Sequence, residues 1–128
     1  MASIEWKSKT EFVLDGVNFK CVHSDYDKYK TSPEEIILLK FKGQIEQYRT
    51  TFEAAPPARV LEFGIFQGGS PVLMTLMFNL QKYVGIDIGP PAAGFDQFLK
   101  EHPVGKRISI HNWVSQDDGK AVRSIVAS

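Results

Sequence analysis

Hydrophobic and polar residues alternate early in the chain. From Val17 to Cys21, every second residue is apolar and the residues between are polar, which is typical of a strand with one buried face. Asp15-Gly16 separates this segment from a second β-rich run over residues 10–14. An Asp-Gly pair suits a two-residue turn in which both residues have positive φ. The pattern therefore predicts a β-hairpin over residues 10–22.

A helical repeat follows the hairpin. Residues 32–35 read Ser-Pro-Glu-Glu, which is a capping box with proline at the first helical position. Apolar residues then recur at spacings of four, four, three and four, at Ile37, Phe41, Ile45, Tyr48 and Phe52. This spacing places them on one helical face. The sequence predicts a long helix from Ser32 to about Glu53, ending before two prolines.

From residue 58 onward, short apolar runs alternate with helical patterns. In chain order we predict a strand over 59–63, a helix over 71–80, a strand over 83–88, a helix over 92–101, a strand over 107–111 and a helix over 117–128. This alternation indicates a parallel sheet with helices on both faces. Because such crossovers are right-handed, the second and third strands should lie successively outward from the first.

These elements predict an α/β fold in two parts. Residues 1–57 would form an N-terminal hairpin and long helix. Residues 58–128 would form a Rossmann-like half-domain, a parallel half-sheet of three core strands with their helices.

The composition narrows the range of partners. The chain has 128 residues, of which 43% are hydrophobic and 23% charged, as in an ordinary globular domain. Lysine and arginine together number 15, as do aspartate and glutamate, so nothing favours nucleic acid or an anionic membrane as a partner. The single cysteine, Cys21, excludes an internal disulfide and fits a reducing, cytoplasmic compartment. The three histidines lack metal-ligand spacing, so we predict no metal site.

The glycine-rich turn over residues 62–70 is the main candidate for chemistry. Gly64 and Gly68 allow a tight turn and a close approach of ligand to backbone. The helix that follows offers free N–H groups at its start. Asp87 lies nineteen residues after Gly68, at the end of the next predicted strand. Because carboxyl ends of neighbouring strands border one crevice, Asp87 is placed to accept hydrogen bonds from the hydroxyls of a ribose.

The turn departs from the dinucleotide-binding fingerprint. That fingerprint requires glycine at three positions, and Phe66 occupies the second of them. A pyrophosphate would meet the aromatic side chain, which disfavours a nicotinamide-dependent dehydrogenase.

The spacing instead resembles that of class I S-adenosylmethionine-dependent methyltransferases. Their first motif has an acidic residue, one residue, glycine, three residues and glycine, and their second strand ends in an acidic residue as residues 84–87 do. The turn is most similar to natural-product and sugar O-methyltransferases and to cephalosporin-hydroxylase-like proteins, over roughly residues 58–118. The resemblance implies S-adenosylmethionine as cofactor and a small-molecule hydroxyl as methyl acceptor.

The resemblance also assigns roles to residues. Glu62, Gly64 and Gly68 would shape the pocket for the amino-acid end of the cofactor. Asp87 would hold the ribose, and the loop at residues 115–118 would lie at the adenine. The full set of expected cofactor-binding residues is Glu62, Gly64, Phe66, Gln67, Gly68, Gly69, Ser70, Asp87, Gln116 and Asp117.

Other interpretations of the same residues stay open. The glycines can serve only to pack a strand against a helix, Asp87 can cap a helix or be solvated, and Asp117 can be a helix N-cap. The alternative function is a non-catalytic nucleotide- or partner-binding module that keeps the pocket shape.

Only three of the seven strands typical of the family are predicted here. We therefore expect either a missing C-terminal half or a second copy of the chain to close the exposed edge of the first parallel strand. No residue can be assigned as catalytic, and we expect the 128-residue chain alone to lack methyl transfer.

Overall fold

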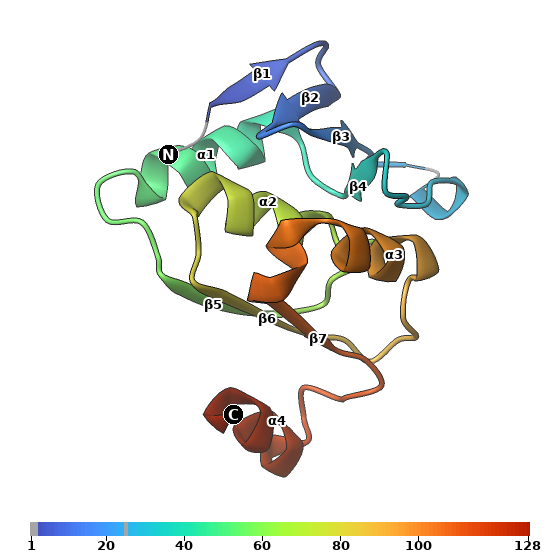
Figure 1. The fold of residues 1–128 in the computed structure, drawn as a ribbon, viewed down its shortest axis with the longest axis vertical. Coiled ribbons are helices and arrows are strands. Elements are labelled where there is room, and N and C mark those ends of the chain that lie inside the picture. Colours follow the sequence, from blue (N-terminus) through green and yellow to red (C-terminus); the bar gives the residue numbers. More distant parts are fainter. Residues whose placement is uncertain (1–2, 25) are drawn as a thin grey trace.

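The described part of the chain contains two separate β-sheets (Figure 1). A computed structural model describes residues 3–24 and 26–128. The strands are β1 (Ile4–Trp6), β2 (Glu11–Leu14), β3 (Val17–Cys21), β4 (Ile36–Leu38), β5 (Arg59–Phe63), β6 (Lys82–Ile86) and β7 (Ile108–His111). The α-helices are α1 (Lys42–Phe52), α2 (Gly69–Phe78), α3 (Ala93–Glu101) and α4 (Gly119–Ala127), and short 3₁₀ turns cover Tyr26–Lys28 and Pro103–Arg107.

The predicted hairpin is confirmed. β2 and β3 pair antiparallel, and Leu14 faces Val17 across the turn. Asp15 and Gly16 have φ values of 50° and 77°, as the turn requires. The hairpin belongs to a sheet of order β1-β2-β3-β4, in which β1 extends it on one side and β4 on the other.

The long helix predicted from Ser32 is wrong in its first part. The Ser32 hydroxyl accepts hydrogen bonds from the N–H groups of Glu34 and Glu35, at 3.3 Å each, and so closes a turn instead of opening a helix. The next residues, Ile36–Leu38, form β4 parallel to β3. All three side chains are buried, whereas one helical face would bury only some of them. The helix itself, α1, begins at Lys42.

The predicted three-stranded parallel sheet is confirmed. Its order is β5-β6-β7, with each strand parallel to the next. Figure 1 shows α2 and α3 on one face and α4 on the other. The second face is only partly covered, because α4 has no buried residue and Leu61 and Phe63 on β5 remain 41% and 44% exposed. In the described chain β5 pairs with β6 alone, which leaves its outer edge open.

Helix α2 lies between the two sheets (Figure 1). It contacts β2 and β4 on one side and β6 and β7 on the other. This position explains why α2 is apolar all round, since both faces are buried. One hydrophobic cluster consequently runs from Phe12 and Leu38 through Met77 to Tyr83, across the boundary at residue 58. No helix in the described chain has the length and apolarity to cross a membrane.

Replacing Gly69 with alanine should destabilise the contact between α2 and β4. A Cβ at Gly69 would lie 2.4 Å from the Ile37 carbonyl oxygen and 2.8 Å from the Leu38 Cα. Both atoms belong to the backbone of β4, so the clash can be relieved only if β4 moves away from α2. We expect Gly69→Ala to lower the free energy of unfolding by about 1–3 kcal/mol, the usual cost of overpacking, in urea denaturation.

Gly43→Ala is the matched control for this experiment. Gly43 lies near the start of α1, and a Cβ there meets no atom within 4 Å. The free energy of unfolding of Gly43→Ala should stay unchanged or rise by up to about 1 kcal/mol, because alanine has a higher helix propensity than glycine. Equal effects of the two substitutions would contradict the packing described for Gly69.

The Cys21 thiol should react slowly in the folded protein. Cys21 is buried on the inner face of β3, and burial raises the pKa of its thiol to about 11. The nucleophilic thiolate is therefore scarce at pH 8. We expect alkylation by iodoacetamide, followed by mass spectrometry, to be slow at pH 8, faster as the pH approaches 11, and prompt in concentrated urea. Equal rates in folded and unfolded protein would contradict the burial of Cys21.

Candidate functional site

The turn between β5 and α2 has an unusual backbone. Gly64, Phe66 and Gly68 have φ values of 83°, 47° and 82°, all in the left-handed region. The two glycines adopt this conformation easily, but an aromatic residue rarely does. The Gly64 N–H donates to the Ile86 carbonyl at 2.8 Å, which extends the β5–β6 ladder into the turn. The chain thereby passes from β5 into α2 with its backbone exposed at Gly64.

Asp87, directly after β6, fixes this turn. One carboxylate oxygen accepts the N–H of Ile65 at 2.8 Å, and the other accepts the N–H of Gly89 at 2.7 Å. The carboxylate therefore joins the loops that follow β5 and β6. An ionised carboxylate has about four acceptor positions, so two hydrogen bonds leave capacity for a ligand.

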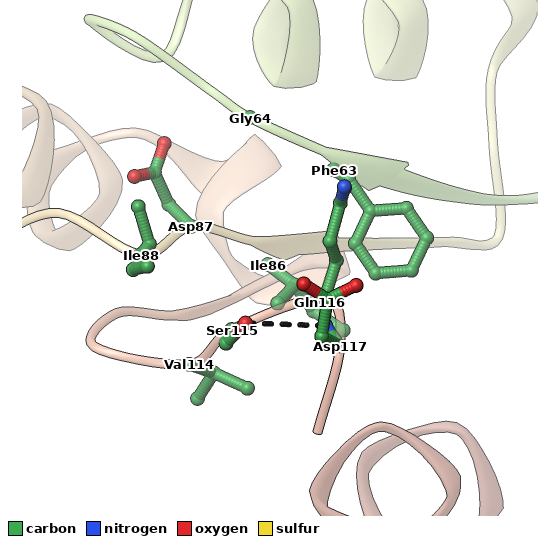
Figure 2. A pocket seen from close by; sticks show the side chains of 9 residues that line it. All are labelled: Phe63, Gly64, Ile86, Asp87, Ile88, Val114, Ser115, Gln116 and Asp117. Carbon is green, nitrogen blue, oxygen red and sulfur yellow. Dashed lines mark hydrogen bonds between the residues drawn. The ribbon is translucent and has the colours of Figure 1, made fainter. Parts of the chain in front are cut away.

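A cavity of about 310 Å³ opens at the carboxyl ends of β5 and β6 (Figure 2). We call it the first cavity. It is lined by Phe63, Gly64, Ile86, Asp87, Ile88, Val114, Ser115, Gln116 and Asp117. Four of the residues predicted from the sequence meet here, namely Gly64, Asp87, Gln116 and Asp117. Its floor and walls are partly apolar, and its polar groups come from two separate loops.

The loop after β7 is held against the end of β6. The Val114 N–H donates to the Asp87 carbonyl at 3.0 Å, and the Ser115 hydroxyl accepts the N–H of Asp117 at 3.2 Å. In Figure 2 the side chains of Gln116 and Asp117 extend from this loop toward Phe63, while the Asp87 carboxylate lies on the side of Gly64.

The helix-cap interpretation of Asp117 is wrong. Helix α4 begins at Gly119, and its N-cap is Asp118, whose carboxylate accepts the N–H of Ala121 at 3.1 Å. The exposed Asp117 carboxylate is thus not engaged in that cap and lines the first cavity.

A second cavity, of about 200 Å³, shares Gly64 with the first. It is lined by Ile37, Leu38, Leu39, Lys40, Glu62, Gly64, Ile65, Phe66, Gly69 and Ser70. Glu62, Gly64, Phe66, Gly69 and Ser70 were among the residues predicted from the sequence. The N-terminal sheet supplies the opposite wall through β4 and Lys40.

Glu62 is held by two hydroxyl groups at this second cavity. Its carboxylate accepts hydrogen bonds from the Ser70 hydroxyl, at 3.1 Å, and from the Tyr83 phenol. Burial raises the pKa of Tyr83 well above its usual range, and the charge and hydrogen bond of Glu62 raise it further. The phenol therefore stays protonated and donates to Glu62, which gives this half-buried carboxylate a hydrogen-bond partner.

Gln67 and Gly68 mainly contact the protein itself. The side-chain oxygen of Gln67 accepts the N–H of Thr31 at 3.1 Å. The backbone carbonyl of Gln67 accepts the Thr31 hydroxyl at 2.7 Å. A Cβ at Gly68 would lie 2.4 Å from the Phe95 ring. Packing thus accounts for the glycine at position 68, as at Gly69, whereas a Cβ at Gly64 meets nothing within 4 Å. Gln67 also lines a third cavity, of about 500 Å³, beside Lys30, Phe66 and Asp87.

Several lining residues were not predicted from the sequence. The apolar side chains of Phe63, Ile88 and Val114 belong to the first cavity, and Ile88 is 72% exposed. Ile88 directly follows Asp87 in the sequence, so its proximity to the predicted ribose-binding carboxylate could have indicated that it lines the site. Lys40 was missed because its segment was predicted as the interior of a helix.

Comparisons with models of known protein families, with curated proteins and with solved structures gave no match. Within residues 3–24 and 26–128, no three histidine, cysteine, aspartate or glutamate side chains gather where they could hold a metal ion. The turn between β5 and α2 and the cavities around Gly64 are therefore the features that bear on function.

Replacing Asp87 with asparagine should destabilise the junction of the two loops. In the wild-type chain, the two Asp87 oxygens accept the N–H groups of Ile65 and Gly89. The asparagine side chain has only one oxygen, so its NH₂ group would face one of these N–H groups and leave it without an acceptor. We expect Asp87→Asn to cost about 1–3 kcal/mol in urea denaturation, the usual penalty for an unsatisfied donor.

Asp117→Asn makes the same chemical change at an exposed position of the first cavity. Its stability should stay within about 0.5 kcal/mol of the parent chain. If the two variants were equally stable, Asp87 would not be the link between the loops.

Proposed function

We propose that this chain is the cofactor-binding portion of an S-adenosylmethionine-dependent methyltransferase whose methyl acceptor is a small-molecule hydroxyl. The observation that carries the proposal is the first cavity, which gathers Gly64, Asp87, Gln116 and Asp117 at the carboxyl ends of adjacent parallel strands. A cytoplasmic location belongs to the same proposal, because the one cysteine is a buried thiol.

The first cavity has the chemistry to take an adenosine. Asp87 retains acceptor positions for ribose hydroxyls, which suits a carboxylate at the end of the second strand. Asp117 and Gln116 offer oxygen acceptors for the exocyclic amine of adenine. Ile88 and Val114 provide apolar surface for the base. Most ligand pockets combine apolar walls with a few placed polar groups in this way.

The amino-acid end of the cofactor is proposed to reach the second cavity past Gly64. Gly64 borders both cavities and has no side chain to separate them. The two cavities measure about 310 and about 200 Å³. Together they fall within the range of about 300–1,000 Å³ that is common for small-ligand sites.

The proposal assigns binding residues but no catalytic residue. When bound, S-adenosylmethionine supplies an activated methyl group. A hydroxyl acceptor additionally needs a general base within about 3 Å of its proton, and no residue of this chain is assigned that role. We therefore expect the 128-residue chain to bind the cofactor without transferring its methyl group.

Isothermal titration calorimetry with S-adenosylhomocysteine tests the proposal. The chain should bind it, and Asp117→Ala should weaken binding about 10- to 100-fold, the scale of a hydrogen bond to a charged group. Asp117 suits the test better than Asp87 because it does not hold the fold together. Glu46→Ala on the exposed face of α1 removes the same charge at a residue that lines neither cavity, and it should leave affinity unchanged.

Two outcomes would contradict the proposal. Binding of a nicotinamide dinucleotide in preference to S-adenosylhomocysteine would assign the site to a different cofactor. Failure of the folded chain to bind any adenosine-containing ligand would favour the alternative of a partner-binding module that keeps only the pocket shape.

A further inference from the structure

Lys40 contributes a positive charge to the second cavity from outside the parallel sheet. It lies between β4 and α1, in the N-terminal part of the chain. Its ammonium donates to the Tyr48 hydroxyl at 3.2 Å and lies 5.0 Å from the centre of the Tyr48 ring. An ammonium has three N–H donors, so the bond to Tyr48 leaves donors for another acceptor.

The same cavity holds a negative charge on a different element. Glu62 comes from β5, and the hydroxyls of Ser70 and Tyr83 both donate to its carboxylate. These two hydrogen bonds leave further acceptor positions on the Glu62 carboxylate, and Glu62 lines the cavity. Lys40 and Glu62, one cationic and one anionic residue, thus both line a single small space of about 200 Å³.

The position of Lys40 is set by the packing of β4. The Val22 N–H donates to the Leu38 carbonyl at 2.9 Å, which keeps the end of β4 beside β3. The lack of a side chain at Gly69 brings the start of α2 against Ile37 and Leu38. Lys40 is therefore held close to the glycine turn by the fold itself.

We infer that Lys40 binds the carboxylate of an α-amino acid group, while Glu62 receives its ammonium. A zwitterionic head group is the ligand chemistry that matches one cation and one anion in one cavity. The inference rests on the proposed function, in which the adenosine lies in the first cavity and the amino-acid end passes Gly64. With this role for Lys40, the N-terminal part of the chain contributes to the ligand site. Lys40 would then distinguish ligands that carry an amino-acid group from ligands that lack one.

A pair of ligands tests this assignment. S-Adenosylhomocysteine and 5′-methylthioadenosine share the adenosine and its sulfur, but only the first has the amino-acid group. Calorimetry with Lys40→Met should show S-adenosylhomocysteine binding weakened about 10- to 100-fold and 5′-methylthioadenosine binding unchanged within about twofold. Lys40→Arg should keep most of the affinity, because it keeps the charge.

Lys42→Met is the matched control. Lys42 lies two residues away, with its ammonium 4.7 Å from the Trp6 ring, and it does not line the second cavity. It should leave both affinities unchanged. Retained binding of 5′-methylthioadenosine by Lys40→Met also shows that the variant is folded.

The outcomes separate the two proposals. If the parent chain binds both ligands and Lys40→Met alters neither affinity, or lowers both by the same factor, the role of Lys40 is overturned while the proposed function stands. If the parent chain binds neither ligand, the proposed function is overturned and the role of Lys40 with it.

Discussion

The carboxylate of Asp87 accepts the backbone N–H groups of Ile65 and Gly89, and so fixes the loops after two adjacent strands. The first of these loops contains the left-handed residues of the glycine turn, whose own backbone hydrogen bonds join Gly64 to Ile86 and Gly68 to Ile65. The backbone carbonyl of Asp87 also accepts the N–H of Val114, which holds the loop after β7 in place. One residue thereby positions all three loops around the first cavity, and a ligand would meet a preformed site.

A second constraint is the close contact between the two sheets. Helix α2 is buried on both sides, and Gly69 allows it to approach β4. A Cβ at Gly94 would collide with the Thr31 carbonyl, so α3 packs closely against the segment that precedes β4. These contacts make the N-terminal sheet a structural support for the glycine turn. They also explain how Lys40, distant in sequence, reaches the cavity beside Glu62.

The sequence predicts best where local chemistry determines the structure. Asp15-Gly16 specifies its hairpin turn, and alternation of strands with helices after residue 58 specifies the parallel order. The segment 36–38 was misassigned because three apolar residues fit either a helical face or a buried strand, and only pairing with β3 decides.

The candidate site shows the same limit. The family resemblance predicted that Asp87 and the loop at residues 115–118 would border one site, and both line the first cavity. Which glycine faces a ligand depends on tertiary contacts instead. Gly68 faces Phe95, and Gly64 faces open space. The most direct test of the account is amide chemical-shift mapping of the ¹⁵N-labelled chain with S-adenosylhomocysteine. We expect shifts concentrated at Gly64, Ile88 and Ser115, whereas shifts confined to α4 and to the hairpin of β2 and β3, or no shifts at all, would contradict this site.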